Sequence, residues 1–106
     1  MLHEPIMLGV LIWRGEAYLT EKVNQILGYT SWRDTKTAIL IFSRNKDFSN
    51  VLTKVPATVA SHQNFKKQLS QSGETQFRYL FHHREDTNRG LITSVLVFNV
   101  PDVSGQ

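Results

Sequence analysis

Apolar residues open the chain with a run of strand length and then change to helical spacing. Residues 6–13 form the first predicted strand, and Gly15 ends it. The next apolar residues recur at i, i+4, i+7 and i+8, which predicts one buried face of a helix over roughly residues 18–30: Leu19, Val23, Ile26 and Leu27. Thr20 is the expected cap of this helix, because its hydroxyl can accept a hydrogen bond from the first turn.

A second strand is predicted over residues 37–43. Its centre, from Ala38 to Phe42, is apolar throughout, as expected of a strand that is covered on both faces. Two apolar strands around a helix predict a βαβ unit with a right-handed connection. Helical spacing then returns, after capping residues in the loop of residues 43–47: Phe48, Val51, Leu52, Val55 and Val59. Because Pro56 interrupts this pattern, we expect a kink there or two short helices.

The remaining pattern predicts strands. Residues 65–69 suggest a short edge strand before a turn at residues 70–74, and residues 77–81 alternate between aromatic and other side chains. Residues 91–100 are the longest β run, which Pro101 ends. The order of elements predicts an α/β domain with a mixed sheet and flanking helices. We expect one domain over residues 1–106, with loose ends at residues 1–5 and 101–106.

Composition narrows the class of protein. The 106 residues are 41% hydrophobic and 20% charged, as in soluble globular chains, and the net charge of +3 leans mildly towards polyanionic partners. The absence of cysteine excludes disulfides, thiolate zinc sites and a cysteine nucleophile. No apolar run has membrane-spanning length, and Glu4 and Pro5 stand where a signal peptide would be basic and then apolar. We therefore expect a cytoplasmic protein.

Several segments resemble the C-terminal part of a PD-(D/E)XK, or restriction-endonuclease-like, nuclease domain. They are the Ile-Trp-Arg-Gly of residues 12–15, the Leu-Thr-Glu…Gln-Ile-Leu-Gly-Tyr of residues 19–29 and the Trp-Arg-Asp-Thr-Lys of residues 32–36. Residues 41–48 and 95–101 match in kind, so that the resemblance covers about four fifths of the chain. It implies a truncated restriction-endonuclease-like core. Gln25 and Tyr29 fall on a Gln-x-x-x-Tyr pattern that the exonuclease branch of this superfamily uses beside its metal site.

The resemblance fails where the catalysis would occur. Nucleases of this kind need carboxylates for a divalent metal and a lysine for the attacking water. The corresponding acid-x-Lys triplet would lie just before Ile12, where this chain has Gly9, Val10 and Leu11. The resemblance therefore implies the fold without the activity, and we expect no catalytic residue, no resident metal and no cofactor. An enzyme alternative remains open, in which Mg²⁺ is held with a second chain or by Glu4, Gln25 and Asp34.

Two other clusters suggest chemistry less strongly. His82 and His83, followed by Glu85 and Asp86, have metal-ligand chemistry, but adjacent residues of a strand point to opposite faces. The triplet from Asp34 to Lys36 imitates acid-x-Lys, but it lies in a turn before a strand. We interpret the first cluster as a polar strand end and the second as solvated turn residues.

Basic and aromatic residues alternate around the predicted βαβ unit, which suits a phosphate backbone with stacked bases. A solvated face over packed aromatics would give the same pattern. The candidate nucleic-acid-binding residues are Arg14, Lys22, Gln25, Tyr29, Arg33, Lys36 and Arg44.

The function that follows is a catalytically inactive nuclease-like domain that binds nucleic acid or a protein partner. The family resemblance suggests a setting of bacterial defence or counter-defence, and an inhibitor of a bacterial immune complex is an alternative. We also expect a homodimer, because the first strand would have an unpaired edge or a poorly covered face unless strands 75–100 fold back over it. The expected interface residues are Leu8, Val10, Ile12 and Trp13.

Overall fold

Strands and helices account for most of the residues that the computed structural model describes, which are 6–29, 36–44, 46–83 and 90–100. The elements follow one another as β1 (Ile6–Ile12), α1 (Glu16–Tyr29), β2 (Lys36–Ser43), α2 (Phe48–Ala60), β3 (Phe65–Ser72), β4 (Gln76–His82) and β5 (Gly90–Asn99). None of these helices is long and apolar enough to span a membrane.

The strands form one mixed sheet in the order β1-β2-β5-β4-β3. Strand β2 is parallel to both β1 and β5, whereas β4 is antiparallel to β5 and to β3. The last strand in the sequence is thus inserted beside β2, and β4 and β3 extend the sheet away from β1. This arrangement confirms the predicted α/β class and mixed sheet, and it leaves β1 at one edge and β3 at the other.

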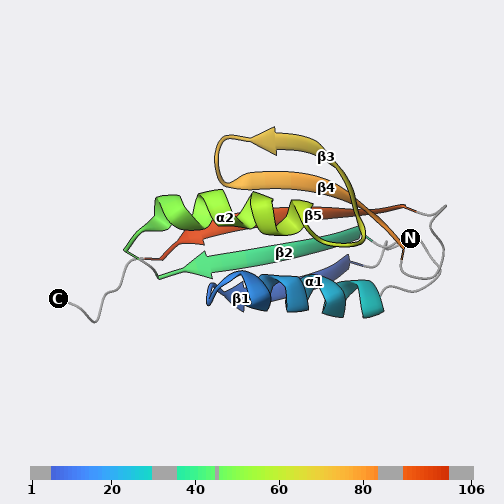
Figure 1. Cartoon of the computed structure of the whole chain (residues 1–106), viewed down its shortest axis with the longest axis horizontal. Helices are drawn as coiled ribbons and strands as arrows, with labels where there is room; N and C mark the ends of the chain where they lie inside the picture. The colour runs from blue at the N-terminus through green and yellow to red at the C-terminus, as the bar shows by residue number, and fades with distance from the viewer. Residues whose placement is uncertain (1–5, 30–35, 45, 84–89, 101–106) are drawn as a thin grey trace, which may run out of the picture.

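Both helices lie on the same face of the sheet (Figure 1). The core fills the space between them and that face, with contributions from both helices and from four strands. Its fully buried members are Leu19, Ile39, Ile41, Val51, Val55, Val59, Tyr79, Phe81 and Val95. Burial alternates along β2, β4 and β5, so every second side chain points towards the helices.

The expectation that β2 is covered on both faces is therefore wrong for the described residues. Thr37, Ile39, Ile41 and Ser43 are buried, but the alternate side chains of β2 are half-buried or exposed. Two helices on one side of a sheet cover one face only. The apolar character of the other face thus needs a separate explanation.

The start of α1 differs from the prediction. The helix begins at Glu16, so Thr20 lies inside it and donates its hydroxyl hydrogen to the Glu16 carbonyl at 3.1 Å. Gly15 explains the early start, because its φ of +110° lets the chain reverse immediately after β1. In α2 the prediction of a capping loop is confirmed, because the Asp47 carboxylate accepts a bond from the Asn50 amide at 3.1 Å.

Two further expectations are corrected in part or in full. At Pro56 a kink or two short helices were expected, and the second alternative is wrong, because α2 is one helix that contains Pro56. Strand β3 runs to Ser72, beyond the expected residue 69, because the reversal occurs at Gly73 with a φ of +62°. The loose ends expected at residues 1–5 and 101–106 lie outside the described residues.

Candidate interaction surface

The face of the sheet that lies away from the helices carries a cluster of exposed apolar side chains. On β1 the exposed fractions are 56% for Leu8, 51% for Val10 and 43% for Ile12. On β5, Ile92 and Phe98 are each 40% exposed. Side chains alternate along a strand, so the exposed residues are separated by residues that are buried against the helices. Leu11, between Val10 and Ile12, is one of these buried residues.

The register of the strands joins these side chains into rows. Val10 pairs with Leu40, which pairs with Leu96 on β5. Ile12 pairs with Phe42, and Phe42 with Phe98, whose rings are stacked at 5.2 Å with an interplanar angle of 20°. We define the open sheet face as the following set: Leu8, Val10, Ile12, Leu40, Phe42, Ile92, Leu96 and Phe98.

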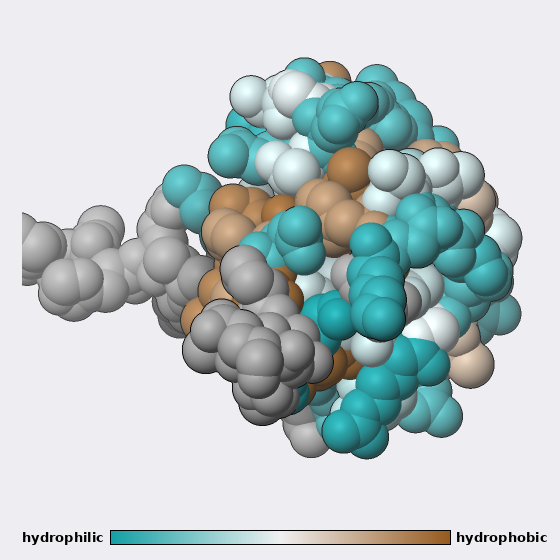
Figure 2. Space-filling view, turned by 90° about the vertical axis from the view of Figure 1, so that its left-hand side faces the viewer, coloured by the Kyte–Doolittle hydropathy of each residue, from teal (hydrophilic) through white to brown (hydrophobic). Residues whose placement is uncertain are grey.

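The open sheet face becomes more polar towards β4. Leu96 pairs with Gln76, and Ser94 pairs with Arg78, which is exposed. Figure 2 looks along the sheet, and hydrophobic atoms gather on its left-hand side, away from the two helices. The apolar cluster thus lies over β1, β2 and β5. On β4 the polar Gln76 and Arg78 form its margin, next to the apolar Leu80, which pairs with Ile92.

The two edge strands differ in chemistry. Strand β3 contains Lys66 and Lys67, its side chains are mostly exposed, and its pairing with β4 is interrupted by two register shifts. Charges and bulges of this kind keep the edge of a sheet from pairing with other chains. Strand β1 contains no charged residue, and among the described residues it pairs with β2 alone. The apolar edge and the open sheet face meet at β1.

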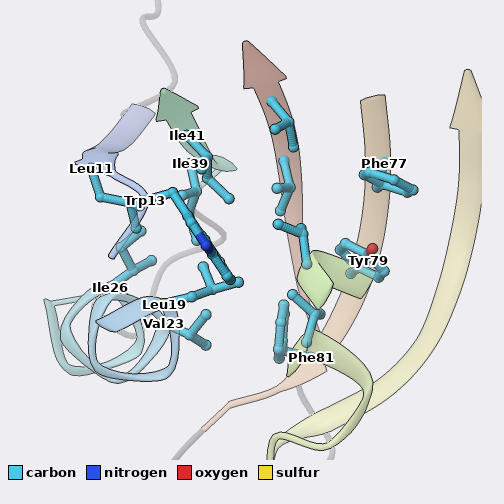
Figure 3. Packing of buried hydrophobic residues seen from close by; sticks show 14 of the residues in the cluster. Leu11, Trp13, Leu19, Val23, Ile26, Ile39, Ile41, Phe77, Tyr79 and Phe81 are labelled. Carbon is cyan, nitrogen blue, oxygen red and sulfur yellow. The ribbon is translucent and has the colours of Figure 1, made fainter. Parts of the chain in front are cut away.

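Trp13 lies in the core instead of on this surface. Its amide donates to the Phe42 carbonyl at 2.8 Å, which continues the pairing of β1 by one residue. Its side chain is only 6% exposed and lies between the sheet and α1, near Leu19 and Val23 (Figure 3). The structure thus places Leu8, Val10 and Ile12 at the surface, as the interface prediction requires, and Trp13 beneath it.

The candidate nucleic-acid-binding residues are divided among different parts of the fold. Arg14 and Arg44 follow β1 and β2 at the carboxyl end of the sheet, whereas Lys36 begins β2 at the opposite end. Lys22 and Gln25 lie between these ends on α1. The described members therefore do not form one compact patch. Arg33 and the side chain of Tyr29 lie outside the described residues.

Part of the set does share one exposed side of α1. The Arg14 guanidinium lies over the Tyr18 ring at 5.8 Å, and the Lys22 ammonium donates to the Gln25 side-chain carbonyl at 3.1 Å. Glu21 lines the same shallow hollow as Tyr18, Lys22 and Gln25, so a carboxylate lies among the basic groups.

The positions of the acid-x-Lys triplet offer no metal ligand. Leu11 is buried in the core, and Gly9 lies so close to α1 that an added Cβ would be 2.7 Å from the Ile26 Cδ1 atom. Val10 points to the open sheet face. Mg²⁺ requires oxygen ligands, so these residues do not fit a metal of the nuclease type.

The other clusters with metal chemistry are only partly described. Within the described ranges, no three His, Cys, Asp or Glu side chains are grouped to hold a metal ion. His82 ends β4 and His83 follows it, whereas Glu4, Asp34, Glu85 and Asp86 lie outside those ranges.

Sequence reasoning found the β1 part of the open sheet face and missed the rest: Leu40, Phe42, Ile92, Leu96 and Phe98. A signal was present, because the segments 38–42 and 95–98 are apolar at both alternating positions. Two predicted helices are too few to cover both faces of a five-stranded sheet.

Comparison with known proteins identified no relative. No family model matches the sequence, and neither a curated protein nor a solved structure is significantly similar to the chain.

Proposed function

We propose that this chain is a non-catalytic domain that binds a protein partner through the open sheet face. One observation carries the proposal: five large apolar side chains are 40–56% exposed on β1 and β5, the two strands that flank β2 in the sheet. Soluble monomers rarely expose a contiguous apolar patch of more than a few hundred Å². A larger exposed patch marks an interaction site.

The chemistry of the surface favours protein over nucleic acid. Phosphate groups are bound by Lys, Arg and backbone amides, and a strand face of Leu, Val, Ile and Phe offers none of these. Among the described residues of β1, β2, β5 and β4, the charged side chains of this face are Lys36 and Arg78, at its margins. Apolar surface of this extent binds most strongly to another apolar protein surface.

We further propose that the fold is a pared-down restriction-endonuclease-like core that acts in the cytoplasm without cleaving nucleic acid. The mixed sheet is compatible with such a core, and Gly9, Val10 and Leu11 supply no ligand for a catalytic metal. The chain should leave linear, circular and single-stranded DNA and RNA intact in Mg²⁺ or Mn²⁺. Cleavage that Glu4→Ala or Asp34→Ala abolishes would instead support the enzyme alternative.

Photo-crosslinking tests the protein-binding function. A photoreactive residue at position 96, on the open sheet face, should form an adduct with a polypeptide in the producing cell. The same residue at position 57 serves as the control, because Ala57 is exposed on α2, which covers the opposite face of the sheet. Adducts at position 57 and none at position 96 would overturn the proposal.

Nucleic-acid binding is the second candidate, and the exposed side of α1 with Arg14, Tyr18, Lys22 and Gln25 favours it. If this surface binds the phosphate backbone, Arg14→Ala should weaken binding about equally across sequences. It should also lower the slope of log affinity against log salt by about one unit. Arg33→Ala should act similarly. Binding that is undetectable at low salt, or indifferent to both changes, would exclude this candidate.

A further inference from the structure

We infer that the partner on the open sheet face is a second copy of this chain, bound face to face. This inference rests on the proposed function and names its partner. The two sheets would stack with their helices outside, in four layers of helices, sheet, sheet and helices. Stacked sheets lie about 10 Å apart, with their inner side chains interdigitated. The half-buried side chains of β2 would then be covered by the second sheet, and β2 would be buried on both faces.

The size of the surface supports a sheet as its occupant. Strands β1, β2, β5 and β4 contain 7, 8, 10 and 7 residues. At a rise of about 3.3 Å per residue and a spacing of about 4.8 Å between strands, their face measures roughly 500 Å². Two copies together would bury roughly 1,000 Å², about where specific interfaces begin. A single helix, about 10 Å wide, would cover only about half of the four strands.

The distribution of polarity selects the orientation of the two copies. The apolar side chains lie on β1, β2 and β5, and the polar margin with Gln76 and Arg78 lies on β4. A two-fold axis perpendicular to the strands, in the plane between the sheets, places β1 of one copy over β1 of the other. Apolar halves then meet, and Arg78 stays at the rim. An axis parallel to the strands would place Arg78 over the apolar β1 of the partner and desolvate its charge.

Lys36 is compatible with this arrangement because it begins β2 at the end of the sheet. Its aliphatic stem can lie along apolar neighbours while the ammonium group reaches water beyond the rim.

Edge-to-edge pairing of two β1 strands would leave the open sheet face uncovered. Such a pairing continues both sheets in one plane, with all helices on the same side. The open sheet face would then double in area and remain in contact with water. Face-to-face packing removes the exposed apolar side chains from water with one self-complementary surface.

Sedimentation and charge substitution test the dimer. The wild-type chain should sediment as a dimer across the micromolar range. Val10→Lys and Ile12→Lys should each raise the dissociation constant about tenfold or more, because the new ammonium group would be buried against apolar side chains. Ala57→Lys is the control, because Ala57 is exposed on α2, which covers the opposite face of the sheet. It should leave the dimer intact. Tyr18 lines one hollow with Val10 and Ile12, so Tyr18→Lys reports on the β1 edge.

A thiol probe distinguishes the face from the edge and does not depend on the lysine variants folding. The chain has no cysteine, so Ile92→Cys introduces a single thiol on β5, two strands from the β1 edge. In the face-to-face dimer this thiol should become protected from a maleimide as protein concentration rises. A dimer that leaves it reactive, or that Tyr18→Lys disrupts, would be an edge dimer and would overturn the inference.

The position 96 adduct separates the two proposals. An adduct of twice the 12.2 kDa chain mass supports both. A chain that stays monomeric while position 96 crosslinks to a different polypeptide would overturn the inference and keep the proposed function. A monomer without an adduct at position 96 would overturn both.

Discussion

His62 joins three elements through one neutral imidazole ring. The Asn64 amide donates to Nδ1 at 3.0 Å, so the ring proton lies on Nε2, which donates to the Asn24 side-chain carbonyl on α1 at 2.7 Å. The ring also meets Phe81 edge-on, with centroids 5.8 Å apart. Protonation of Nδ1 would break the bond from Asn64, and burial lowers the pKa of His62 from its usual value of 6.5.

The stability of the fold should therefore fall on acidification. Between the lowered pKa of folded His62 and 6.5, the unfolded chain binds more protons than the folded chain. The contribution of His62 to the free energy of unfolding is thus complete above about pH 6.5, and it is lost as the pH falls through this window. Urea unfolding at several pH values should show this decrease in the free energy of unfolding. In His62→Gln the decrease between the same pH values should be smaller. An unchanged pH dependence in His62→Gln would contradict this role.

Gly9 allows α1 to approach β1 closely. An added Cβ would lie 2.7 Å from Ile26 Cδ1 and 3.2 Å from Lys22 Cδ, so glycine lets α1 pack directly on β1. Close packing of α1 against one side of β1 explains why its other side chains, Leu8, Val10 and Ile12, are left on the open sheet face.

At the scale of elements, α2 tolerates a proline in its interior. Pro56 has no amide hydrogen, so the Leu52 carbonyl four residues earlier receives no helical hydrogen bond from it. The helix persists because its other face is firmly packed, with Val51, Val55 and Val59 fully buried. Tertiary packing thus outweighs an unfavourable local propensity.

Pro56→Ala should therefore stabilise the fold by about 1–2 kcal/mol, since it restores the missing donor while giving back some entropy to the unfolded chain. Urea unfolding at one fixed protein concentration measures the difference. Pro56→Gly is the informative comparison. It restores the same donor but has lower helix propensity, so it should gain about 1 kcal/mol less than Pro56→Ala. Equal destabilisation by both would show that the proline ring is needed for packing against its neighbours.

The two edge strands also show that composition alone does not decide where a strand lies in the sheet. Strand β3 is polar and bulged, and its composition alone makes it a suitable edge. Strand β1 has the composition of an interior strand, yet the fold places it at an edge.

At the scale of the whole molecule, the chain has one well-packed layer and one apolar face in contact with water. If a second copy covers that face, association and folding are linked, because the dimer binds only folded chains. The thermal unfolding midpoint should then rise with protein concentration in the wild type. It should change little with concentration in Ile12→Lys, and a wild-type midpoint that ignores concentration would argue against a dimer.

The pattern of apolar residues predicted the two helices and the strands β1, β2, β4 and β5, because it reflects faces that are local in the sequence. Strand β3 is polar and was expected only as a short edge strand. Helix ends were less predictable, since Gly15 started α1 four residues before its expected cap at Thr20. The burial of Trp13 was not predictable from its place in an apolar run, because only α1 lying across β1 decides which side of the strand is inside.

The sequence by itself determined the α/β class, the alternation of strand faces and the absence of a metal ligand at residues 9–11, since each follows from residue identity and spacing along the chain. The tertiary structure decided which faces are covered and which residues meet across the fold. Strand β5 could pair with β1 or with β2, and its pairing with β2 left β1 at the edge. Both helices then packed on one side of the sheet (Figure 1). The open sheet face results from these long-range choices, which no local pattern specifies.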